Sequence, residues 1–123
     1  MRMIRAFCAG MVLALCVAAA AVAGGQFFVG SAADIAGIKA SLPAGDGASG
    51  IHVDGNFALL QMYDQHVSWP SVYRRVSGEH WKLLVPGGGV MGISQMTHGG
   101  VPAAIAHKIC SGWPTDYTPC GNF

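Results

Sequence analysis

Charged side chains are scarce in this chain of 123 residues. Asp, Glu, Lys and Arg make up 11% of the sequence, less than half of the roughly 25% that is typical of soluble domains. No run of Lys and Arg is long enough to neutralise many phosphates, which argues against a nucleic-acid partner. A hydrophobic share of 52% excludes a disordered chain, and the length suits one domain.

Motifs of nucleotide and acyl-transfer chemistry are also missing. No G-x-S-x-G elbow occurs, and the glycine run after Pro86 lacks the Lys and Ser/Thr of a phosphate-binding loop. Ser94 is the residue that a nucleophilic enzyme would use, with a His brought to it by the fold. We expect no catalytic residues, no cofactor and no enzyme activity.

Histidine is comparatively frequent, with five residues, but no two of them stand at a metal-ligand spacing such as i,i+4. Together with Met91 and Met96 they raise the alternative of a copper site, because imidazole and thioether groups suit that metal. The histidines are His52, His66, His80, His98 and His107. Their spacing favours surface or turn positions, so no metal ligands are predicted.

The charges that are present divide the chain into two parts. Arg2 and Arg5 are the only charged residues before Asp34, and residues 6–23 are almost continuously apolar. Basic residues ahead of an apolar run keep that end in the cytoplasm and place the remainder across the membrane. We expect an export segment over residues 1–23 and a single small globular domain over residues 24–123, in a periplasmic, inner-membrane-associated or extracellular location.

Three kinds of export segment fit the first residues. A cleaved signal peptide would be cut between Ala23 and Gly24, after the small-x-small pattern Ala-Val-Ala. An uncleaved anchor from residue 6 to about residue 29 is long enough to cross a bilayer core of about 30 Å. A prepilin-type leader would be cut between Gly10 and Met11 and would leave the apolar segment as a helix.

The four cysteines separate in the same way. Cys8 and Cys16 lie inside the apolar segment, and neither follows the small residue that normally precedes a lipidated cysteine. Cys110 and Cys120 lie beyond it, in an oxidising compartment, and are the available pair there. The nine residues between them include Gly and Pro and can turn back, so a disulfide Cys110–Cys120 is predicted.

Helical signals mark the start and the end of the domain. Ser31 and Asp34 are typical of a helix start, and apolar residues then recur at helical spacing until Pro43. If the apolar segment is retained, residues 11–42 form one long helix. A loop is expected over residues 43–50, and a second short helix over residues 57–66 after the cap-like Asp54-Gly-Asn56.

A hairpin and a last helix are expected in the second half. Residues 80–85 and 90–96 alternate as strands around the glycine run 87–89, and residues 77–79 form a turn. Pro102 suits the first turn of a helix over Ala103–Ile109, and Gly112 suits its end. The predicted class is α+β, with an N-terminal apolar helix, a small antiparallel sheet containing a hairpin, and a C-terminal helix tied by the disulfide.

Several stretches resemble the type IV pilins, in particular the type IVb and conjugative pilin group. The start Gly10-Met11-Val-Leu-Ala resembles that group's prepilin cleavage region. Four later stretches resemble its sheet and its V-P-x-x-x-C helix. They are the segment from Trp69 to Trp81, the turn Val85-Pro-Gly-Gly-Gly-Val90, the strand Met91-Gly-Ile-Ser-Gln-Met96, and Gly100-Val101-Pro102-Ala-Ala with the later Cys110. The chain departs from the family at Leu15, where the family has a Glu, and in its short length.

The resemblance implies an exported structural subunit, pilin-like or a minor pilin, of a fibre or a secretion apparatus. Its partners would be other pilin-like subunits or another protein, and the inner membrane through the apolar segment. Leu15 stands where the family has a Glu, and a minor subunit at a fibre tip can do without that Glu. The alternative is a free periplasmic or secreted binding or inhibitor domain with a cleaved signal peptide.

Overall fold

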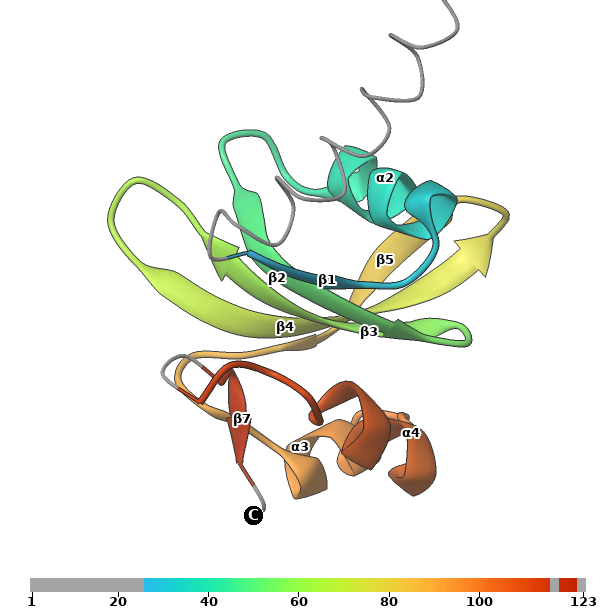
Figure 1. Cartoon of the computed structure of the whole chain (residues 1–123), viewed down its shortest axis with the longest axis vertical. Coiled ribbons are helices and arrows are strands. Elements are labelled where there is room, and N and C mark those ends of the chain that lie inside the picture. Colours follow the sequence, from blue (N-terminus) through green and yellow to red (C-terminus); the bar gives the residue numbers. More distant parts are fainter. Residues whose placement is uncertain (1–25, 116–117, 122–123) are drawn as a thin grey trace, which may run out of the picture.

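A computed structural model describes residues 26–115 and 118–121 (Figure 1). Ten elements follow one another along this part of the chain. They are β1 (Phe27–Val29), α2 (Ala32–Ser41), β2 (Gly47–Asp54), β3 (Phe57–Tyr63), β4 (Ser68–Ser77), β5 (His80–Pro86), β6 (Met91–Gly92), α3 (Ile93–His98), α4 (Ala103–Ile109) and β7 (Cys120–Gly121). The α+β class is confirmed.

Five strands form one mixed sheet in the order β1-β2-β3-β4-β5. β2 to β5 are antiparallel neighbours joined in sequence, whereas β1 runs parallel to β2. A parallel pair needs a crossover connection, and α2 supplies it. β6 and β7 make a separate parallel pair at the C-terminal end of the domain. The predicted small antiparallel sheet is therefore larger than expected and mixed.

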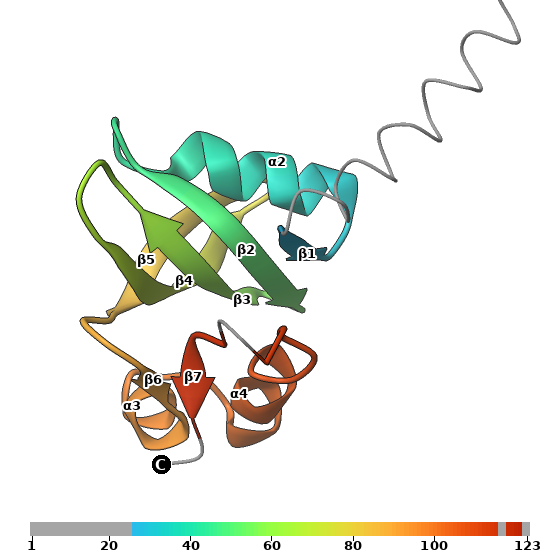
Figure 2. The same ribbon diagram turned by 60° about the vertical axis from the view of Figure 1, so that its left-hand side comes forward.

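Both faces of the sheet are covered. Figure 2 shows α2 above the strands and α3, α4 and β7 below them. Leu60 of β3 packs with Ile38 on the α2 side, whereas the adjacent Leu59 packs with Ile109 on the other side, and all four are fully buried. Successive side chains of a strand point to opposite faces, so β3 supplies apolar groups to both layers.

The helix after β1 begins and ends where the sequence predicts. The Ser31 hydroxyl accepts a hydrogen bond of 3.0 Å from the Asp34 amide, and the helix ends at Ser41, two residues before Pro43. Gly37 faces the β4–β5 turn, where an added Cβ would lie 2.6 Å from the Glu79 carbonyl oxygen. The absence of a side chain therefore lets α2 approach the sheet closely.

The predicted helix over residues 57–66 is wrong. This segment is β3, and the preceding Asp54-Gly-Asn56 is the turn of a β2–β3 hairpin, where Gly55 has φ 62°. A helix would turn one stripe of apolar residues to one layer, but Ala58, Leu59, Leu60 and Met62 are needed by two layers on opposite sides. The predicted loop over 43–50 is also too long, because β2 begins at Gly47.

The predicted hairpin between residues 80–85 and 90–96 is wrong as well. β5 pairs instead with β4 across the turn at Gly78, which confirms the turn predicted over 77–79. After the glycine run the chain leaves the sheet, pairs briefly with β7, and continues as α3. Met91 and Met96, which a strand over residues 90–96 would place on opposite faces, are both fully buried in the same core cluster.

The last helix is confirmed at Ala103–Ile109, with Pro102 before it and Gly112 in a left-handed conformation after it. One long helix over residues 11–42 is wrong, because the strand β1 interrupts it. The predicted apolar helix itself lies outside the described residues. Within the described part of the chain, no helix has the length and hydropathy to cross a bilayer.

The close approach of α2 predicts that Gly37→Ala destabilises the domain. Helix propensity alone favours Ala by about 1 kcal/mol. Overpacking against the rigid Glu79 carbonyl costs about 1–3 kcal/mol, and we expect this cost to prevail. Urea denaturation should show a lower free energy of unfolding. Gly88→Ala is the control, because its added Cβ meets nothing within 4 Å. A Gly37→Ala domain more stable than the parent would contradict the close contact.

Candidate functional site

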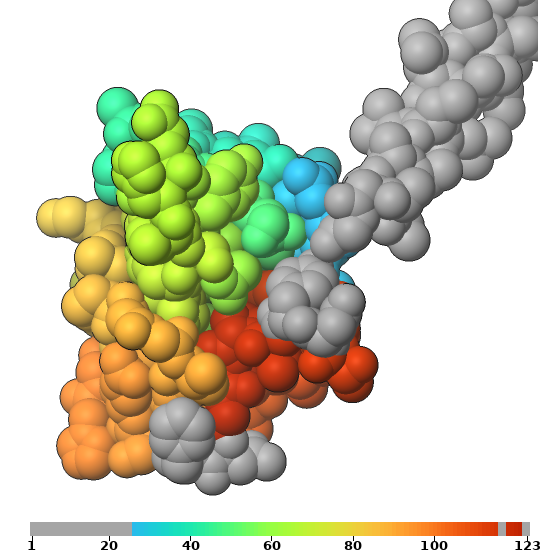
Figure 3. Space-filling view, turned by 90° about the vertical axis from the view of Figure 1, so that its left-hand side faces the viewer, coloured from blue at the N-terminus to red at the C-terminus, as the bar shows by residue number. Residues whose placement is uncertain are grey.

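The predicted disulfide is present. Cys110 follows α4 and is bonded to Cys120 of β7, with 5.9 Å between their Cα atoms. The β6–β7 pairing adjoins the bond, and the Met91 amide donates to the Pro119 carbonyl oxygen at 2.8 Å. The disulfide therefore fastens the end of the chain to the helix and to the strand that leads into α3. Figure 3 shows this red C-terminal segment lying directly against the green strands.

Trp113, inside the disulfide loop, contacts the first strand of the sheet, β1. Its indole Nε1 donates to the Ile109 carbonyl oxygen at 2.7 Å, and its ring centroid lies 4.7 Å from that of Phe27 in β1. Gly50 in β2 leaves room for this ring, since a Cβ there would collide with it. The first strand and the C-terminal loop thus share one aromatic contact.

His52 lies at the same junction and is only 8% exposed. Its Nδ1 is 3.0 Å from the Ser111 carbonyl oxygen, so Nδ1 carries the proton and donates it. Its ring meets the Phe27 ring edge-on, with 5.8 Å between centroids. Burial lowers the pKa of His52 below its ordinary value of 6.5, and the bond to Ser111 opposes this shift only in part.

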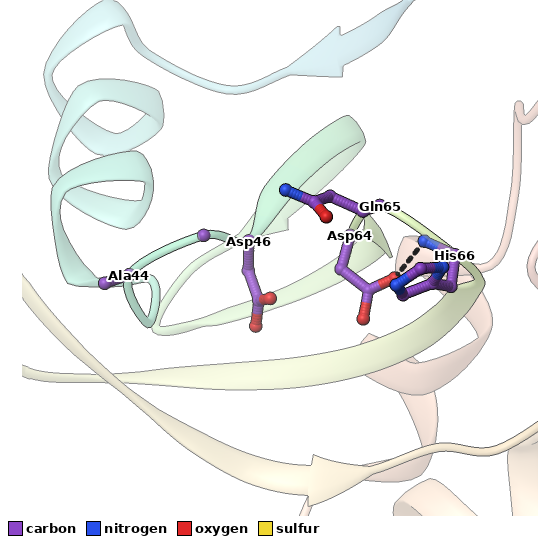
Figure 4. Close-up of a pocket in the computed structure, with 6 residues that line it drawn as sticks. Ala44, Asp46, Asp64, Gln65 and His66 are labelled. Atoms are coloured by element: carbon purple, nitrogen blue, oxygen red, sulfur yellow. Dashed lines mark hydrogen bonds between the residues drawn. The ribbon is translucent and has the colours of Figure 1, made fainter.

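An open depression of about 250 Å³ lies at the other end of the strands (Figure 4). It is lined by Ala44, Gly45, Asp46, Asp64, Gln65 and His66. Figure 4 shows the carboxylates of Asp46 and Asp64 pointing the same way from two neighbouring loops. Asp64 Oδ1 accepts from the amides of Val67 at 2.9 Å and His66 at 2.7 Å. These bonds lower the pKa of Asp64, and they use its carboxylate to shape the turn.

Arg75 is the most connected polar side chain on the α2 side of the sheet. Its guanidinium pairs with Asp34 at 2.9 Å, donates to the Gly78 carbonyl oxygen at 2.7 Å and to Asn56 Oδ1 at 3.0 Å. It also lies over the Trp81 ring, 4.5 Å from the centroid. The hydrogen bond from Arg75 lowers the pKa of Asp34. Arg75 therefore joins two hairpin turns to the start of α2.

Ser94 does have a histidine beside it, one turn along α3. Ser94 Oγ and His98 Nδ1 are 3.5 Å apart, but the same Nδ1 is 2.9 Å from the Ser94 carbonyl oxygen. An Nδ1 that donates to this carbonyl holds the proton and does not act as a base toward the hydroxyl. Both side chains are exposed, so this pair is an ordinary helix-surface contact.

The other candidates of the sequence do not converge. Over residues 26–115 and 118–121, no three His, Cys, Asp or Glu side chains gather closely enough to hold a metal ion. Met91 and Met96 are core residues, and His66, His80, His98 and His107 are exposed on different segments. The processing candidates Gly10, Met11, Ala23 and Gly24 lie outside the described residues.

The junction at His52 and the Arg75 cluster were missed by sequence reasoning. The partners of His52 come from β1 and from Ser111, far away in the sequence, so no local spacing marks them. The opposite charges of Arg75 and Glu79, four residues apart, are the one local signal of the cluster, because these two side chains form an ion pair at 3.7 Å. No family model, no curated protein and no solved structure matches the chain.

Closure of the Cys110–Cys120 loop predicts that Cys120→Ser lowers the free energy of unfolding by about 2–3 kcal/mol, the range for a loop of this length. Thermal denaturation of the oxidised protein measures the effect. Thr115→Ser, an exposed change within the same loop, is the control. Free thiols in protein purified without reductant, or an unchanged Tm in Cys120→Ser, would contradict the prediction.

Proposed function

We propose that this protein is an exported structural subunit, pilin-like, of a fibre or a secretion apparatus. The observation that carries the proposal is the unit built by the Val101-Pro102 segment. Val101 is buried, Pro102 opens α4 against the sheet, and Cys110 at the end of that helix is bonded to Cys120. These are the residues on which the resemblance to type IVb pilins rests.

The use of polar groups in the described part of the chain supports a subunit that works through its surface. The Arg75 guanidinium donates to the Gly78 carbonyl of the β4–β5 turn, and the Asp64 carboxylate accepts from an amide of the β3–β4 turn. The His98 ring hydrogen-bonds to a backbone carbonyl of its own helix, α3. Each of these groups is satisfied by the fold. Chemistry on a substrate needs polar groups that converge on a shared point and remain available to it.

The sheet edges favour contacts through side chains over added strands. On the free side of β5, the Trp81 amide donates to Ser41 Oγ at 3.3 Å, and the Pro86 carbonyl oxygen accepts from Gln95 Nε2 at 3.2 Å. The other edge strand, β1, is three residues long. Capped and short edges discourage pairing with a second chain. A partner subunit would therefore dock on faces and loops.

The alternative is a free periplasmic or secreted binding domain. Its signal peptide would be cut between Ala23 and Gly24, and all elements of the described residues, from β1 at Phe27 onward, lie after that cut. Both mature forms would therefore contain them. Both proposals share export and the disulfide, and they differ in whether the apolar segment stays on the mature protein.

Mass spectrometry of the mature N-terminus distinguishes the two. The pilin-like proposal expects a chain that begins at Met11 and is recovered with the inner membrane or with a fibre fraction. Gly10→Val should then abolish processing, and Ala23→Leu should leave it unchanged. A mature chain that begins at Gly24, with the opposite response of the two variants, would reject the pilin-like proposal and support the free domain.

A further inference from the structure

Three segments that are distant in the sequence meet around the His52 imidazole. β2 carries the residue, β1 presents the Phe27 ring edge-on to it at 5.8 Å, and the loop after α4 presents the Ser111 carbonyl oxygen at 3.0 Å. Phe27 in turn contacts Trp113 at 4.7 Å. His52 therefore joins β2 to the loop after α4 by a hydrogen bond, and its ring contacts Phe27, the β1 residue that packs on the same loop.

The surroundings of the ring favour its neutral form. β1 contributes Phe27 and Val29, and β3 contributes Leu59 opposite His52, none of which is titratable. Two charged groups act on it through space: Asp54 from its own strand raises its pKa, and Lys108 from α4 lowers it. His107 is also on α4 and is exposed. Burial outweighs the other effects, so the pKa of the ring is lowered in the folded junction.

We propose that His52 is an acid-sensitive latch, which holds β1 against the C-terminal loop at neutral pH and releases β1 in a mildly acidic compartment. The neutral ring satisfies the Ser111 carbonyl through Nδ1 and packs its apolar edge on Phe27. A second proton places a full charge against the Phe27 ring and near the like-charged Lys108. The proposal is independent of the proposed function, because β1 is present in either mature form.

The direction follows from linkage. With β1 released and the ring in water, His52 takes up a proton near pH 6.5, whereas the latched ring takes it up at a lower pH. The equilibrium constant that favours latched over released β1 is therefore largest above about pH 6.5. Below that value this constant falls by about tenfold for each pH unit, until the pH reaches the pKa of the latched ring.

β1 is the element that yields first because it is the shortest strand of the sheet and lies at its edge. It is an edge strand of three residues, and its outward side has no strand neighbour in the described sheet. Its residues are half-buried or exposed, in contrast to the buried centre of β2 and β3. Elements of this kind open at a lower free energy than the whole domain unfolds.

Hydrogen exchange of the exported, disulfide-bonded protein tests the latch. Protection factors of the residue 27–29 amides, corrected for intrinsic rates, are compared at about pH 7.5 and about pH 5, on either side of the ordinary histidine pKa. The wild type should lose β1 protection at the lower pH, while the β3 amides keep theirs. His52→Asn keeps a donor for the Ser111 carbonyl but has no proton to gain, so its β1 protection should be the same at both pH values.

His107→Asn is the matched control, because it removes an exposed histidine from a nearby helix, and it should behave as the wild type. Unchanged β1 protection in the wild type overturns the proposal whatever the variants do. The proposal is equally wrong if β3 opens together with β1, since His52 would then serve global stability alone. A His52→Asn protein that keeps the wild-type pH response also overturns it.

Discussion

Two-sided burial of the five-stranded sheet is the constraint on which the rest of this structure depends. A sheet with apolar groups on both faces needs a layer on each side. α2 provides one layer, and the segment from β6 to β7 provides the other. The second layer is made of two short helices, α3 and α4, and the two-residue strand pair of β6, before α3, and β7, after α4. Its cohesion rests on the buried methionines and on the disulfide that closes it.

Sequence reasoning found the parts whose signals are local. Ser31 and Pro43 bound α2, Pro102 and Gly112 bound α4, and the expectation of an export segment left Cys110 and Cys120 as the available pair. It failed where a residue's role is set by distant neighbours. The run around Leu59 and Leu60 has no single apolar face, so its period does not distinguish a helix from a strand buried on both sides. Of the candidate site, the disulfide was predictable, whereas His52 was not, because its acceptor Ser111 lies 59 residues away.

The polar groups of the domain act mainly on the domain itself. Arg75 ties two turns to α2, and Asp64 shapes the β3–β4 turn, at opposite ends of the strands. With so few charges in the chain, those that appear at turns have a large share in fixing strand register. The side chains of Arg75 and Asp64 are thus used to hold the fold.

The packing of Phe27 on Trp113 brings the first described strand against the loop after α4. The other contacts of β1 come from its nearest elements in the chain: it pairs with β2, and its Phe28 packs on the α2 side, where the Lys39 ammonium lies over the ring. During synthesis these elements are made early and the loop is made late. β1, α2 and β2 can therefore associate before the Phe27–Trp113 contact exists, and this junction is completed only when the C-terminal loop has been synthesised.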